Sequence, residues 1–161
     1  MREVPPVSGG QEQGDGAPNI LLLEDNPADV RLLFEAFRES PLHPHIEVAE
    51  DGEQALALLQ RHDHRTGALR PDLLLLDLRT PKKSGLAVLT EVRADPALQD
   101  LPAMILTSSL AKEDRQKAAA LGVERFLHKP ADLEAFFLIA REVAEWWRRK
   151  SEEKPLVFHS E

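Results

Sequence analysis

Four consecutive leucines lead directly into an aspartate and a turn in residues 73–85, which read LLLLDLRTPKKSG. An apolar run of this kind, with no alternating polar residue, is typical of a strand that is buried on both faces of a parallel sheet. Comparable short runs occupy residues 20–23, 46–49, 103–106 and 123–127. The sequence therefore predicts five strands, most of them buried, in one parallel sheet.

Amphipathic stretches alternate with these runs and predict five helices. The first follows Asn26 and Pro27, two further helices follow Gly52 and Gly85, and a fourth, residues 111–121, stops before Gly122. The last has an apolar stripe at helical spacing, made of Leu133, Phe136, Phe137, Ala140, Ala144 and Trp147. Alternating strands and helices indicate a doubly wound α/β domain, and right-handed crossovers favour the flavodoxin-like strand order 2-1-3-4-5.

The composition excludes several classes of protein. The 161 residues contain 28 Asp and Glu, 20 Lys and Arg and no Cys, which gives a net charge of −8. A disulfide scaffold, an iron–sulfur centre, a thiolate zinc site and a catalytic thiol are thereby excluded. The acidic balance argues against a nucleic-acid or anionic-membrane binder. The longest apolar run, residues 135–140, is too short to span a bilayer, and we expect a soluble, cytoplasmic protein.

Glycine and proline mark the start of the predicted domain. Residues 1–18 hold four of the eight glycines and three of the twelve prolines, so we expect a disordered extension there. Residues 19–150 form the predicted domain. Residues 151–161 form a tail with one apolar patch, Leu156-Val157-Phe158. Each terminal piece has one base and three acids, which leaves 18 bases and 22 acids in residues 19–150.

Polar and charged residues follow the first, third, fourth and fifth predicted strands. Glu24 and Asp25 follow the first strand, Asp77 the third, Thr107 the fourth and Lys129 the fifth. The carboxyl ends of parallel strands meet at one edge of the sheet, so these side chains are expected to converge. Three carboxylates at one place repel one another and need a cation, and hard oxygen ligands suit Mg²⁺. Asp77 can accept a phosphoryl group, with Thr107 and Lys129 contacting its oxygens, so the set predicts aspartyl phosphorylation.

Four motifs carry a resemblance to a known family: ILLLEDN (residues 20–26), LLLLDLRTPKKSG (73–85), PAMILTSS (102–109) and FLHKP (126–130). Because the four motifs occur in this order, the chain resembles the receiver domain of bacterial two-component response regulators over residues 19–150. The resemblance implies that Asp77 is the phosphoacceptor. It also implies a Mg²⁺ site made of Asp25, Asp77 and the backbone carbonyl of Arg79, with Glu24 acting through water.

The same resemblance assigns further roles. Thr107 and Lys129 would contact the phosphoryl oxygens, a cis peptide bond would join Lys129 to Pro130, and Thr107 and Phe126 would form the conformational switch. The sequence departs from the usual pattern at Thr80, where many receivers have an apolar residue, and at Ser108, where an alanine is common.

Three segments are similar to those of regulators that pair with phytochrome histidine kinases. They are residues 24–40 (EDNPADVRLLFEAFRES), the insert at residues 60–70 and the PKKSG turn. The implied partner is a sensor histidine kinase, with a bacteriophytochrome as the candidate. Residues 151–161 are too few for a DNA-binding output domain, so we expect a single-domain regulator that signals to a protein or a relay.

Two alternatives to a phosphorylated signalling protein remain at this stage. An aspartyl-phosphate phosphatase generally needs a second Asp two positions after the nucleophile, where this chain has Arg79. A phosphate-independent scaffold would usually have lost part of the acidic set, which is intact here. We therefore expect a signalling protein rather than an enzyme.

The last predicted helix also suggests a homodimer. Leu138, Ile139, Val143 and Trp146 extend its apolar surface beyond the stripe that one sheet face buries, which predicts an interface with a second copy. Leu156-Val157-Phe158 in the tail would reach onto that partner.

Overall fold

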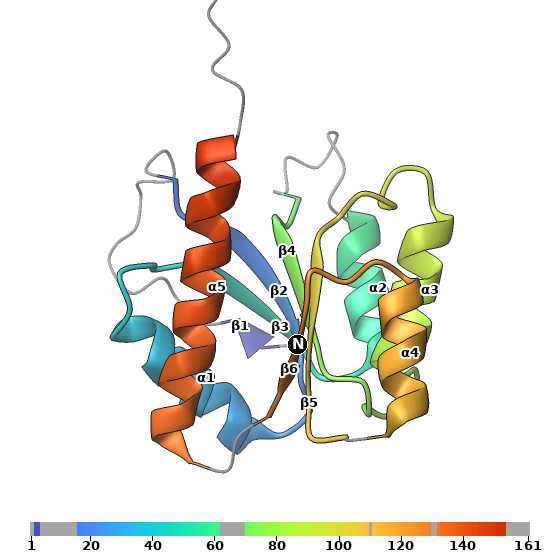
Figure 1. Cartoon of the computed structure of the whole chain (residues 1–161). Coiled ribbons are helices and arrows are strands. Elements are labelled where there is room, and N and C mark those ends of the chain that lie inside the picture. Colours follow the sequence, from blue (N-terminus) through green and yellow to red (C-terminus); the bar gives the residue numbers. More distant parts are fainter. Residues whose placement is uncertain (1, 4–15, 62–69, 110, 130–131, 154–161) are drawn as a thin grey trace, which may run out of the picture.

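The centre of the molecule is a parallel sheet whose five strands lie in the order β3-β2-β4-β5-β6 (Figure 1). The computed structural model describes residues 2–3, 16–61, 70–109, 111–129 and 132–153. The parallel strands are β2 (Asn19–Leu23), β3 (His45–Ala49), β4 (Leu73–Leu76), β5 (Ala103–Thr107) and β6 (Arg125–His128). Counted along the chain, this order is 2-1-3-4-5, so the predicted flavodoxin-like topology is confirmed.

A short sixth strand lies at the edge of the sheet. The two residues of β1 (Arg2–Glu3) pair antiparallel with β3, opposite Val48 and Glu47. The expected disorder of residues 1–18 stays a prediction, since residues 1 and 4–15 lie outside the described residues. The open edge of β3 offers unpaired backbone groups to any short segment. A two-residue pairing made through the backbone leaves no pattern in the sequence.

Helices cover both faces of the sheet (Figure 1). α1 (Pro27–Arg38) and α5 (Leu133–Glu153) pack on one face, and α2 (Gly52–Arg61), α3 (Gly85–Ala94) and α4 (Lys112–Ala120) cover the other. The four leucines of β4 are fully buried and point alternately into the two cores. As the sequence predicted, β4 is buried on both sides. This burial holds Asp77, the residue that follows the strand, in a fixed position.

Two caps fix where the helices near the acidic residues begin. The side chain of Asn26 accepts hydrogen bonds from the backbone N–H groups of Ala28 and Asp29, at 2.9 and 3.4 Å, and Pro27 occupies the first helical position of α1. Ser84 caps α3 in the same way by accepting from Ala87 N at 3.1 Å. Both helices therefore start directly after loops at the carboxyl edge of the sheet.

The predicted dimer face on the last helix is wrong for three of its four residues. Ile139, Val143 and Trp146 are at most 6% exposed and belong to the core between α1, α5 and the sheet. Only Leu138 is exposed, at 55%. Because α5 packs against α1 as well as against the sheet, it buries a wider apolar arc than one sheet face requires.

The carboxyl-terminal boundary also differs from the prediction. α5 continues to Glu153, three residues beyond the expected end of the domain. Leu156-Val157-Phe158 lies outside the described residues. Within the described ranges, no helix combines the length and apolarity that crossing a membrane would require.

Candidate functional site

Lys129 lies at the centre of the acidic residues that follow β2 and β4. Its Nζ donates to Asp77 Oδ2 at 2.9 Å and lies 3.0 Å from both Glu24 Oε1 and Asp29 Oδ2. Glu24 and Asp77 are 1% and 6% exposed. The structure therefore brings together Glu24, Asp77 and Lys129, as the strand-end pattern predicted.

Asp29 is the member of this group that sequence reasoning missed. It lies in the first turn of α1, where an acidic residue is common because it complements the helix dipole. The only available signal was its position five residues after Glu24, which does not distinguish an ion-pair partner from a capping acid.

The carboxylates form a group with room for a cation. One oxygen from each of Glu24, Asp25 and Asp77 lies within 4.8 Å of the others. Oε1 of Glu24 is buried and, although it lies close to the Lys129 ammonium, its geometry allows no hydrogen bond. Asp25 is exposed. A divalent cation fits this set, because a buried oxygen remains available and three anionic ligands converge.

The pKa values at the site show how incompletely its charges are balanced. Burial raises the pKa of Glu24 to about 7, against the lowering effect of its hydrogen bond from Lys129. Burial lowers the pKa of Lys129, but hydrogen bonds to Asp77, Glu24 and Asp29 outweigh it, so that the pKa ends above its ordinary value. Lys129 therefore stays protonated, and a further positive charge beside Glu24 would favour the ionised form of its carboxyl group.

Asp77 is held by the backbone on both sides. Its own N–H donates to Leu23 O at 3.0 Å, and its Oδ1 accepts from Arg79 N at 3.2 Å. Gly85 approaches from α3 so closely that a Cβ there would lie 2.1 Å from the Asp77 carbonyl oxygen. The ligand role expected for the Arg79 carbonyl stays a prediction, since the structure places only the Arg79 N–H against Asp77.

The two predicted switch residues lie on neighbouring strands. Thr107 ends β5, is 1% exposed, and accepts from Ser109 N at 3.2 Å through its Oγ1. Phe126 in β6 pairs in register with Ile105 and is half-buried, with the Arg115 guanidinium 4.9 Å from its ring centroid. Residues alternate along a strand, so Thr107, Ile105 and Phe126 face the same side of the sheet.

Arg79 forms a group of polar contacts with Ser109 and Asp114, called the Arg79 rim below, which the sequence did not predict. Its guanidinium donates to Ser109 Oγ at 3.3 Å and to Asp114 Oδ2 at 3.2 Å, and Ser109 Oγ donates to the same carboxylate at 2.8 Å. These contacts join the loop after β4 to the start of α4. Pro130, expected to follow a cis peptide bond, lies outside the described residues.

This geometry suits nucleophilic attack by a carboxylate. Asp77 is a buried carboxylate held beside a permanent ammonium, and two more acids provide oxygen ligands for a cation. Such a carboxylate can attack an electrophilic phosphorus while the cations offset the charge that the phosphoryl group brings. Thr107 lies at the end of the adjacent strand as a hydroxyl donor.

Comparison with known proteins agrees with this description. Residues 20–141 match the family described as "Response regulator receiver domain". Response regulator Rcp1 of Synechocystis sp. is 35% identical over 128 residues, which cover 80% of this chain and 87% of Rcp1. Its Mn²⁺-bound form superimposes with a TM-score of 0.72 over 81% of this chain and 94% of the other, at 35% identity.

Two further similar structures are those of a phytochrome response regulator and a bacteriophytochrome response regulator. The phosphorylated cyanobacterial phytochrome response regulator RcpA has a TM-score of 0.75 at 36% identity and covers 83% of this chain and 96% of its own. The bacteriophytochrome response regulator RtBRR has a TM-score of 0.65 at 36% identity, with coverages of 78% and 76%. The chain therefore belongs to the response regulator receiver domain family.

Proposed function

We propose that this receiver domain accepts a phosphoryl group on Asp77 in a reaction that requires Mg²⁺. The observation that carries the proposal is the contact of 2.9 Å between Lys129 Nζ and Asp77 Oδ2, beside the carboxylates of Glu24 and Asp25. This arrangement gives a nucleophile, a fixed cation and a set of metal ligands at one sheet edge.

In the proposed reaction, a carboxylate oxygen of Asp77 attacks the phosphorus atom of the donor. The bond between phosphorus and the leaving atom breaks, the leaving atom keeps the electron pair, and an acyl phosphate forms. Lys129 and the Thr107 hydroxyl contact the phosphoryl oxygens. Glu24, Asp25, Asp77 and the carbonyl of Arg79 would hold Mg²⁺, which when bound supplies positive charge next to the transferred group.

The donor that we propose is a phosphohistidine on a phytochrome-type sensor histidine kinase. The similarity to Rcp1, RcpA and RtBRR over most of the chain supports this partner. Phosphorylation would be read out through Thr107 and Phe126, which face one side of β5 and β6. The cytoplasmic location and the lack of nucleic-acid binding stay predictions.

A single incubation separates this function from the two alternatives. The protein is mixed with Mg²⁺ and acetyl phosphate, and the phosphorylated fraction is measured by mass spectrometry, with Asp77→Asn and a chelator as controls. The proposal expects one acid-stable, base-labile phosphoryl group that is lost in both controls. Absence of label with every donor would favour a scaffold, and rapid turnover of many phosphomonoesters would favour a phosphatase.

A further inference from the structure

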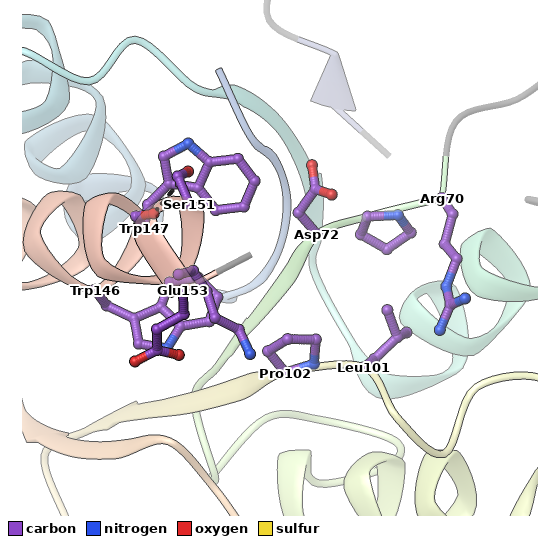
Figure 2. A pocket seen from close by; sticks show the side chains of 10 residues that line it. Arg70, Asp72, Leu101, Pro102, Trp146, Trp147, Ser151 and Glu153 are labelled. Carbon is purple, nitrogen blue, oxygen red and sulfur yellow. Dashed lines mark hydrogen bonds between the residues drawn. The ribbon is translucent and has the colours of Figure 1, made fainter. Parts of the chain in front are cut away.

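A cavity of about 450 Å³ lies far from the phosphorylation site, between the end of α5 and the loops that lead into β4 and β5 (Figure 2). Figure 2 shows Trp146 and Trp147 on the α5 side of the cavity and Leu101 and Pro102 across from them. Pro102 precedes β5, whereas Thr107 ends it. The cavity therefore belongs to the opposite edge of the sheet and has no part in the chemistry of Asp77.

The indole N–H groups of both tryptophans that line the cavity are already used in hydrogen bonds. The indole N–H of Trp146 already donates to Glu124 Oε1 at 3.2 Å, and that of Trp147 donates to the carbonyl oxygen of Gly16 at 2.6 Å. Pro71 and Pro102, which also line the cavity, have no backbone N–H. The indole and proline rings therefore give the cavity one apolar side.

Two polar side chains around the cavity are already used, whereas Arg70 and Glu153 add charged side chains to its lining. Asp72 Oδ2 accepts from Asn19 N at 2.8 Å, and Ser151 Oγ donates to Trp147 O at 3.1 Å. The ammonium of Lys150 lies 5.9 Å from the centroid of the Trp146 ring, within range of a cation–π contact. The lining therefore combines charged side chains with the apolar surface of Leu101, the two prolines and the two indoles, and this apolar surface favours a peptide segment with apolar side chains.

We propose that the apolar patch Leu156-Val157-Phe158 of the same chain docks in this cavity. Glu153, the last described residue of α5, lines the cavity, so the following residues begin at its rim. Pro155 disfavours helical backbone at Lys154 and directs the chain away from the helix axis. Phe158 lies five residues after Glu153, a reach of at most about 17 Å.

Docking within the chain is favoured over docking between two copies because the segment is tethered at the cavity. A short flexible tether gives an effective concentration in the range of about 1 mM, far above that of a second copy at micromolar protein. Burying Leu156 and Phe158 against the indole and proline rings removes their apolar surface from water.

The two tryptophans allow a direct test, because they are the only ones in the chain and both line the cavity. Tryptophan emission and acrylamide quenching are compared for the full chain, Phe158→Ala and the matched control Ser160→Ala. We expect a red shift and greater quenching in Phe158→Ala but no change in Ser160→Ala. Circular dichroism checks that both variants are folded.

The measurement is repeated over a range of protein concentrations together with sedimentation. If the segment docks within its own chain, the difference in emission between wild type and Phe158→Ala should not change with protein concentration and should persist in the monomer. The proposal is overturned if wild type and Phe158→Ala have the same emission and quenching. It is also overturned if the difference appears only as the protein self-associates, which would assign the cavity to the tail of a second copy.

Discussion

A single ammonium contacts three carboxylates at the proposed phosphorylation site. Lys129 contacts Glu24, Asp29 and Asp77, each within about 3 Å, while the pKa of Glu24 is raised to about 7 by its burial. One positive charge cannot fully balance these carboxylates. The residues are therefore arranged for a second cation. The free energy of unfolding should depend strongly on the presence of the Lys129 ammonium and on Mg²⁺.

Replacing Lys129 with methionine should destabilise the metal-free protein. Removing one partner of a buried ion pair costs about 3–5 kcal/mol, because the remaining charges lose their compensation. We expect the free energy of unfolding, measured with urea in the presence of a chelator, to fall by about 3 kcal/mol. Lys112→Met, at an exposed position in α4, serves as the control. An unchanged urea midpoint in Lys129→Met would show that the ammonium does not hold the carboxylates together.

Asp25→Asn should weaken Mg²⁺ binding without harming the fold, because Asp25 is exposed yet belongs to the acidic group. A tenfold weaker affinity reduces the stabilisation by saturating Mg²⁺ by about 1.4 kcal/mol. The measurement is the Mg²⁺ dependence of the urea midpoint, with the exposed Asp100→Asn as control. Equal Mg²⁺ dependence in Asp25→Asn and wild type would remove Asp25 from the metal site.

At the scale of elements, the contact between α3 and the end of β4 determines where Asp77 lies. Gly85 permits the first turn of α3 to approach the backbone of Asp77, and its N–H donates to Leu78 O at 3.1 Å. Ser84 caps the helix at the same point. The start of α3 and the position of the nucleophile are thus parts of one packing arrangement.

Gly85→Ala should be far more damaging than Gly122→Ala. A Cβ at residue 85 would meet backbone atoms of Asp77, and overpacking against backbone costs about 3 kcal/mol. Gly122 has a φ of +73° but open space around it, so alanine there should cost only about 1 kcal/mol through strain. Thermal and urea unfolding of both variants give the comparison. Similar losses in the two variants would contradict the close approach at Gly85.

The two sides of α5 should also differ in stability measurements. Ile139→Ala leaves a cavity in the core between α1, α5 and the sheet and should cost about 3 kcal/mol. Leu138→Ala removes an exposed side chain and should change the free energy of unfolding by no more than about 0.5 kcal/mol. If Leu138→Ala proved the more destabilising of the two, the burial pattern of α5 would be wrong.

At the scale of the whole molecule, the sequence was informative where a pattern has one physical meaning. The four leucines of β4 required burial on both faces, and the residues after the strands then had to meet at one edge. The faces of α5 were not predictable in this way, because an amphipathic pattern does not state how many elements a helix packs against. The pairing of β1, the contact of Asp29 and the Arg79 rim depend on tertiary proximity and leave no periodic signal.

The two proposed sites lie at opposite edges of one sheet. The acidic edge carries Asp77, Lys129 and the proposed Mg²⁺ ligands, and the other edge carries the tryptophan cavity and the end of α5. Of the net charge of −8, residues 19–150 carry −4, and three of their acidic groups gather at the proposed metal site. In the proposed function, this local concentration of charge, rather than the overall acidity, would attract the cation and its phosphoryl group.

The most direct measurement is to locate the phosphoryl group after incubation with Mg²⁺ and a phosphodonor. Borohydride reduces an aspartyl phosphate to homoserine, and peptide mass spectrometry then identifies the converted position. We predict conversion at residue 77 alone, lost when Mg²⁺ is chelated. Conversion at another aspartate, or phosphorylation that persists unchanged in Asp77→Asn, would contradict the assignment of Asp77 as the phosphoacceptor.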